Sequence, residues 1–151
     1  MGTVSDLLRS QAEVILDGST AALERSNEQH YAQAGSEAAR ERFARLLELV
    51  TVSVEKRDLV PMIDYATRIA NERFDAGFDI REVQRAFHVL EETIWETVVE
   101  SVPQSELAES LGLVGTVLGA GRDALARTYV SRASQQHVPS LDLSALFRGG
   151  R

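Results

Sequence analysis

Apolar residues recur at three- and four-residue steps along nearly the whole chain, which is the period of an amphipathic α-helix. No stretch alternates at the two-residue period of a half-buried strand, and no glycine-rich turn joins a strand to a helix. The pattern predicts an all-α fold: a bundle of about five helices. The expected helices cover residues 4–23, 39–54, 59–74, 80–98 and 105–136.

Local sequence signals mark several helix ends. Asp58 is the expected N-cap of the third helix, where Pro61 is tolerated because first-turn N–H groups have no intrahelical partner. Gly77 is expected to end that helix. Asp79 and Glu82 form a capping-box pattern, which predicts that a fourth helix starts immediately.

Two segments interrupt the helical pattern. Gly18 falls inside the first segment, which is therefore either one bent helix or two. Residues 27–36 are polar and lack apolar periodicity, so they predict a loop. No internal repeat and no low-complexity linker is present. We expect one helical domain over 1–137 and a C-terminal tail over 138–151.

Composition narrows the class further. Hydrophobic residues make up 44% and charged residues 26% of the chain, as in ordinary globular proteins. The absence of cysteine excludes disulfides, thiolate metal sites and a cysteine nucleophile. No apolar run approaches the ~20 residues of a membrane span, and no basic segment precedes an apolar one as in a signal peptide. We therefore expect a cytoplasmic location and no membrane partner.

The formal net charge of −7 argues against a nucleic-acid partner, because such surfaces need clustered Lys and Arg to replace counterions. Most basic residues are interleaved with acids at helical spacing, as in AARERFARLLE. That spacing indicates a solvated helix face. A local basic patch is the less favoured alternative.

Residues that carry chemistry are present, but without a catalytic or metal-binding pattern. The histidines are His30, His88 and His137. His88 lies mid-helix beside carboxylates, and we interpret it as structural or exposed rather than as a haem, metal or phosphotransfer residue. The Glu-x-x-His pairs of di-iron bundles are absent, as are the serine motifs G-x-S-x-G and S-x-x-K. We expect no enzyme activity, no cofactor and no metal.

The fifth helix carries three glycines on one face, Gly112, Gly115 and Gly119. Each interior glycine costs a helix about 1 kcal/mol relative to alanine, so a compensating role is expected. Close packing of two helix backbones is the favoured interpretation. A cavity for a small ligand is the alternative.

Trp95 lies off the main apolar stripe of the fourth helix, and Val99 and Val102 continue its side. A second apolar face means that the helix is buried on two sides or presents an interface. Burial in the core is the default interpretation, and a homodimer face is a serious alternative, since aromatic anchors dominate such contacts.

The expected tail is too apolar for a simple disordered end. It either folds back on the bundle or docks on a protein partner as a short amphipathic segment, and the two alternatives are equally supported. The apolar positions that would make this contact are Leu141, Leu143, Leu146 and Phe147.

The stretch ATRIANERFDAGFDIREVQRAFHVLEETIWETVVE resembles the N-terminal sensory domain of RsbT co-antagonist proteins of bacterial stressosomes, the RsbR type. A helix ends in a glycine and an apolar residue, Gly77 and Phe78. An acid-capped helix follows, with an aromatic near its middle and a tryptophan, Phe87 and Trp95. With the preceding FARLLELV segment, the similarity extends from about Val4 to Arg132.

The resemblance implies a haem-free, globin-like helical domain, usually dimeric, that senses a signal and passes it to an output domain. The chain departs from the pattern because no output domain follows the fifth helix; it is either a free-standing sensor or a fragment. We expect a non-enzymatic signalling or regulatory module that binds a small ligand or a protein and transmits the signal through its dimer or tail. The alternatives are a haem-binding gas sensor of the globin type and an adaptor or cargo protein addressed by its tail.

Overall fold

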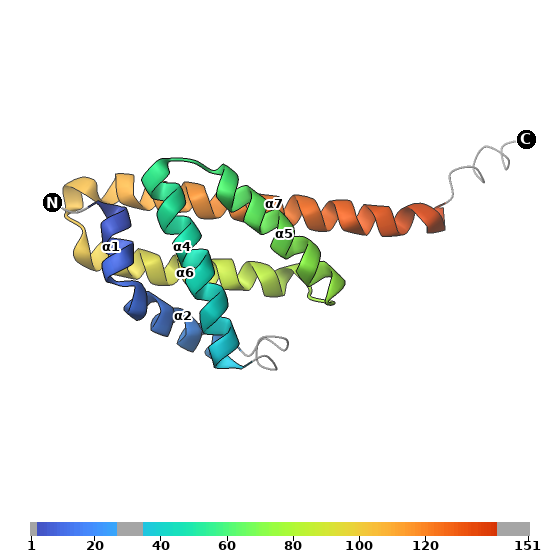
Figure 1. Cartoon of the computed structure of the whole chain (residues 1–151), viewed down its shortest axis with the longest axis horizontal. Coiled ribbons are helices and arrows are strands. Elements are labelled where there is room, and N and C mark those ends of the chain that lie inside the picture. The colour runs from blue at the N-terminus through green and yellow to red at the C-terminus, as the bar shows by residue number, and fades with distance from the viewer. Residues whose placement is uncertain (1–2, 27–34, 142–151) are drawn as a thin grey trace, which may run out of the picture.

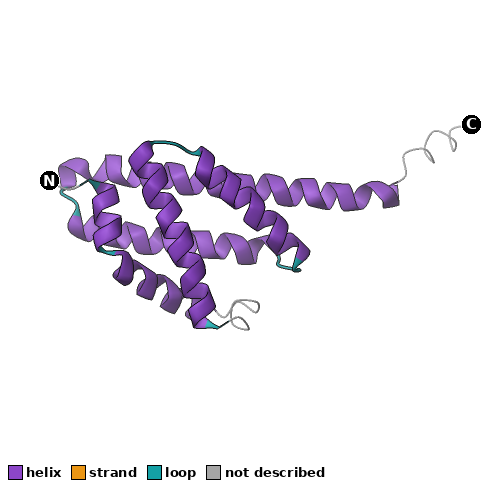
Figure 2. Ribbon diagram, in the orientation of Figure 1, coloured by secondary structure: helices purple, strands orange, loops and turns teal. Residues whose placement is uncertain are grey.

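The computed structural model of the chain describes residues 3–26 and 35–141. Over these residues the chain forms six helices and no strand, which confirms the all-α prediction (Figures 1 and 2). The helices are α1 (Val4–Ser10), α2 (Ala12–Ser26), α4 (Ser36–Lys56), α5 (Val60–Asp75), α6 (Ile80–Ser101) and α7 (Gln104–Leu141).

The first apolar segment forms two helices, as one of the two alternatives predicts, but the break lies at Gln11 rather than at Gly18. Gly18 lies inside α2, where a Cβ would approach Cγ2 of Thr93 on α6 to 3.0 Å. A glycine at this position therefore permits the close crossing of α2 and α6. Tertiary packing, not a helix break, accounts for Gly18.

The predicted helix boundaries are present as hydrogen bonds. Asp79 accepts the backbone N–H of Arg81 at 2.8 Å, and Glu82 accepts that of Asp79 at 3.1 Å, completing the capping box of α6. The predicted cap of α5 is wrong by one residue, because the N-cap is Leu59; Asp58 lies just before it and accepts the backbone N–H of Val60 at 3.0 Å. Gly77 has a φ of 86°, which only glycine adopts readily, and it separates α5 from α6.

Helices α6 and α7 form an antiparallel hairpin joined at Val102 and Pro103, and the other helices pack against it (Figure 1). Helix α5 packs along α7, and α2 packs against both α4 and α6. One continuous apolar core results. Its fully buried members include Leu8, Ile15, Val50, Met62, Leu90, Ile94, Val114, Leu118 and Leu125.

Helix α7 is longer than the sequence predicts. The expected end lies near Gln136, whereas the helix continues through Pro139 to Leu141. Its last described ties to the body are made by Arg132, which donates to Asn71 at 2.9 Å and pairs with Asp75 on α5. Beyond these contacts the helix projects from the body (Figure 1).

Candidate functional site

Helix α6 exposes two large apolar side chains. Trp95 is 45% and Val99 55% exposed. Trp95 is therefore not a core residue, and the default interpretation of burial is wrong. Val102 differs from them: it caps the C-terminus of α6 and is half-buried against the core.

Helix α7 lies beside this apolar strip. Glu91 precedes Trp95 by one helical turn and accepts a hydrogen bond from Arg122 of α7 at 2.6 Å, and its side chain is only 12% exposed. A Cβ on Gly115 would lie 3.9 Å from a carboxylate oxygen of the same Glu91. Because the two helices are antiparallel, the turn of α6 that carries Trp95 lies level with the turn of α7 that precedes Gly115.

Of the three glycines on one face of α7, Gly115 lies near Glu91 of α6, whereas Gly112 and Gly119 face open space. A Cβ on Gly112 or Gly119 would meet no atom within 4 Å. The close-packing interpretation is therefore wrong for these two positions within the described chain. The tight crossing lies at Gly121, where a Cβ would be 2.8 Å from Phe87 and 3.0 Å from Met62.

Exposed apolar side chains on α6 and a strip without side chains on α7 thus lie next to each other. We call this surface the α6–α7 face, made of Trp95, Val99, Gly112, Gly115 and Gly119. The sequence pattern identified both halves, but not that they are neighbours.

His88 lies on the exposed side of α6, where its Nε2 lies 2.8 Å from a carboxylate oxygen of Glu92, four residues on. Its side chain is 52% exposed, so the described structure offers no enclosed haem site around it. Among the described residues, no three His, Cys, Asp or Glu side chains gather as metal ligands would. His30 lies outside the described residues, as does the side chain of His137.

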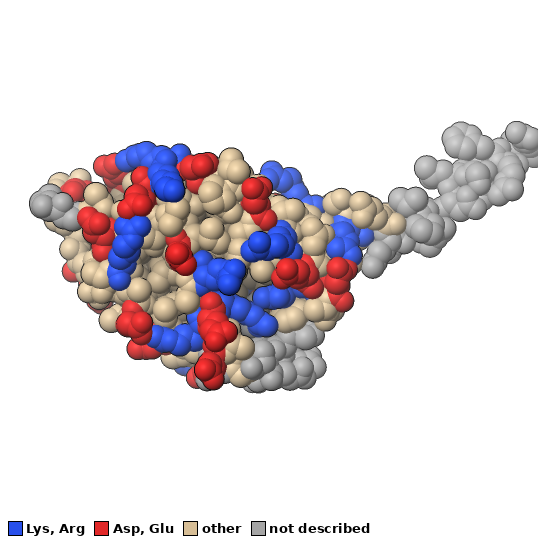
Figure 3. All heavy atoms as spheres, viewed as in Figure 1, with Lys and Arg blue, Asp and Glu red and all other residues tan. Residues whose placement is uncertain are grey.

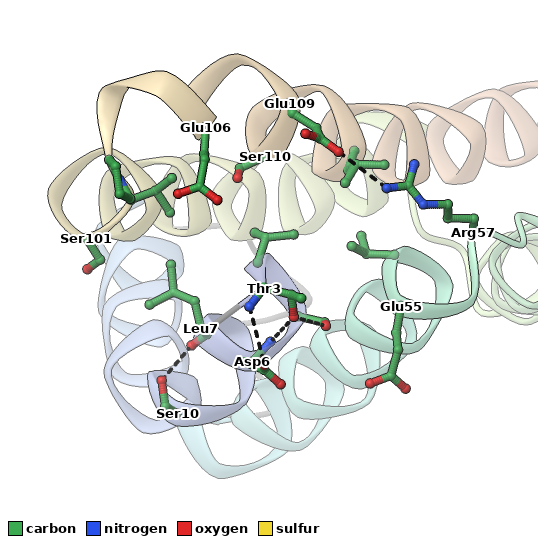
Figure 4. A pocket seen from close by; sticks show the side chains of 16 residues that line it. Thr3, Asp6, Leu7, Ser10, Glu55, Arg57, Ser101, Glu106, Glu109 and Ser110 are labelled. Atoms are coloured by element: carbon green, nitrogen blue, oxygen red, sulfur yellow. Dashed lines mark hydrogen bonds and ion pairs between the residues drawn. The ribbon is translucent and has the colours of Figure 1, made fainter. Parts of the chain in front are cut away.

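A polar groove of about 920 Å³ lies where the N-terminal helix meets the turn between α6 and α7 (Figure 4). Its carboxylates are largely engaged within the protein. Asp6 accepts the backbone N–H of Thr3 at 3.1 Å, and Glu109 accepts a hydrogen bond from Arg57 at 3.3 Å. Glu55 pairs with Arg9 at 2.7 Å. The Arg9–Glu55 pair joins α1 to α4, and the Arg57–Glu109 contact joins the residue that caps α4 to α7.

The predicted docking segment cannot be placed. Leu141 ends α7, and Leu143, Leu146 and Phe147 lie outside the described residues. None of the described helices combines the length and apolar character that a membrane crossing requires.

The described residues form an all-α domain with a helical body, an exposed apolar face and a long terminal helix. The family model for the RsbT co-antagonist protein rsbRD N-terminal domain matches residues 5–143. The chain therefore belongs to this family, and its role is regulatory. No curated protein and no solved structure matches the chain.

Proposed function

We propose that the protein is a non-enzymatic signalling domain that forms a homodimer through the α6–α7 face and passes its signal along α7. Family membership supports the regulatory role and a stress-response context. We also propose that the protein forms a homodimer and that it works in the cytoplasm, as stressosome proteins do.

One observation carries the proposal: a tryptophan exposed beside a helix strip without side chains. A two-fold symmetric contact joins the same patch on both copies. The Trp95 side chain of one copy can then lie against Gly112 and Gly115 of the other, where the backbone is accessible. This contact would bury an aromatic side chain, which is the dominant kind of anchor at interfaces.

Helix α7 supports the transmission step. Its 38 residues span about 57 Å at 1.5 Å per residue. The first part of the helix contributes Val114, Leu118 and Leu125 to the core, and the last part projects beyond Arg132. A shift of the body relative to its dimer partner would therefore be carried outward by a continuous helix.

Light scattering at micromolar concentration tests the dimer. We expect about twice the monomer mass of 16.6 kDa. Trp95→Ala should raise the dimer dissociation constant about 30-fold, because truncation of such an anchor costs about 2 kcal/mol. Val60→Ala is the matched control, since Val60 is a comparably exposed apolar residue (59%) on α5.

A wild-type protein that stays monomeric at these concentrations contradicts the proposal. So does a Trp95→Ala variant that dissociates no more readily than Val60→Ala. Circular dichroism of both variants shows whether the helical fold is retained.

A further inference from the structure

Helices α4 and α5 diverge from the turn that joins them, and a groove of about 530 Å³ lies between them. Basic side chains gather in this part of the surface (Figure 3). The groove contains four arginines and two glutamates. Its charged members are Arg42, Arg45, Arg68, Arg73, Glu41 and Glu72. We call it the arginine groove.

Three of these arginines, Arg45, Arg68 and Arg73, form no ion pair with any residue that the structure describes. By contrast, Arg9, Arg57 and Arg122 each bind a carboxylate of another helix. Glu41 and Glu72 line the same groove, at four-residue spacing from Arg45 and Arg68, yet within the described residues neither forms an ion pair with them.

Tyr65 lines the groove and is only 8% exposed. The Arg68 guanidinium carbon lies 5.4 Å from the centre of its ring. Burial raises the pKa of the Tyr65 phenol. The positive charges of Arg73, Arg45 and Arg68 act against this rise in pKa, and the negative charge of Glu72 adds to it. That hydroxyl forms no hydrogen bond within the described residues.

The arginine groove continues into the core. A small cavity of about 30 Å³, enough for one water-sized group, shares Tyr65, Ile69 and Arg73 with it. Nε of Arg73 is buried and has no hydrogen-bond partner among the residues that the structure describes. A buried donor without a partner costs free energy, and a bound acceptor would remove that cost.

We propose that the arginine groove binds a small oxyanion, the phosphate or carboxylate group of a low-molecular-weight ligand. The guanidinium groups of Arg45, Arg68 and Arg73 supply the charge-assisted donors, and the Tyr65 hydroxyl supplies a further one. The inference rests on the proposed signalling role in one respect: the ligand would be the signal that the domain senses. Binding itself requires neither the dimer nor a partner.

Size and charge favour a small molecule over a polyanion. The groove has the volume of ordinary ligand sites, about 300–1,000 Å³. Glu41 and Glu72 flank the arginines, and the chain carries a net charge of −7. The negative charges around the groove would repel an extended polyanion. A single anionic group is small enough to contact the arginines without approaching those charges.

Calorimetric titration of the full chain tests the site with sodium phosphate, sodium citrate and, at matched ionic strength, sodium chloride. We expect saturable binding of phosphate, citrate or both, and none of chloride. The double variant Arg45→Gln, Arg68→Gln should weaken binding at least about tenfold. Arg127→Gln is the control, an exposed arginine on α7 outside the groove.

Response to phosphate alone identifies a phosphate ligand, and response to citrate alone a carboxylate; either supports the site. In NMR spectra, the Arg73 Nε–H resonance should shift on binding. The inference is overturned if neither anion binds, or if the double variant binds as tightly as Arg127→Gln. If a monomeric protein binds the anion, the proposed dimer is rejected and the anion site is supported. If the protein is a dimer that binds no anion, the dimer is supported and the anion site is rejected.

Discussion

At the scale of single residues, the glycines of α7 differ in what surrounds them. Gly121 lies in the core, where a Cβ would overlap the Phe87 ring and press on Met62. Gly112 lies on the surface with nothing near it. Sequence spacing could not separate these cases, because both are interior glycines of the same helix.

Alanine at the two positions should therefore change stability in opposite directions. Gly121→Ala forces the core apart at a cost of about 1–3 kcal/mol, against a gain of about 1 kcal/mol in helix propensity, so the net change should be destabilising by up to about 2 kcal/mol. Gly112→Ala receives that gain without the cost and should be stabilising by about 0.5–1 kcal/mol. Urea unfolding measures both, and a Gly121→Ala variant as stable as wild type would show that Met62 and Phe87 yield freely.

At the scale of elements, short-range signals predicted the start of α6 well and the break between α1 and α2 poorly. The capping box of Asp79 and Glu82 depends on residues three apart, so the sequence contains all of it. Gly18 looks like a helix break by propensity, but its environment is set by Thr93 from α6. Contacts between distant segments override a preference of about 1 kcal/mol.

The N-terminal cap of α1 makes that helix sensitive to acid. Hydrogen bonds from the backbone and then the side chain of Thr3 hold the pKa of the Asp6 carboxyl below its ordinary value. A lowered folded pKa stabilises the fold above the pKa of the unfolded chain, and this contribution is lost as the pH falls through the folded pKa.

Asp6→Asn should accordingly lower the melting temperature at neutral pH. The difference from wild type should shrink as the pH falls through the folded pKa of Asp6. Asp123→Asn, an exposed acid of α7, is the control and should change neither. A deficit of Asp6→Asn that persists in strong acid would mean that the carboxylate charge is not what stabilises the cap.

At the scale of the whole molecule, Gly115 contributes to the α6–α7 face, so its expected role is in the contact between the two copies of the proposed dimer. A Cβ there would approach only Glu91, at 3.9 Å, which is ordinary van der Waals contact. In the proposed dimer it would occupy the place of the partner's tryptophan.

Gly115→Leu should therefore weaken the dimer, raising its dissociation constant at least tenfold, while the melting temperature of the dilute monomer holds or rises with helix propensity. Light scattering and a melt at low concentration measure the two effects. A lower monomer melting temperature with an unchanged dimer would restore the interpretation of a tight crossing inside the chain.

The sequence by itself determined the all-α class, most helix boundaries and the apolar stripes, because periodicity and caps depend on residues within two turns of each other. The family resemblance also rests on such local patterns, and the family match confirms it. Only the tertiary structure decided which faces meet. Arg45 and Arg68 look like ordinary solvated residues within their own helices, and they form one groove around Tyr65 only because α4 and α5 fold side by side. Likewise, Trp95 becomes an anchor beside a bare strip of α7 only once the α6–α7 hairpin closes, because pairing between elements depends on the packing of the whole core and not on spacing along the chain.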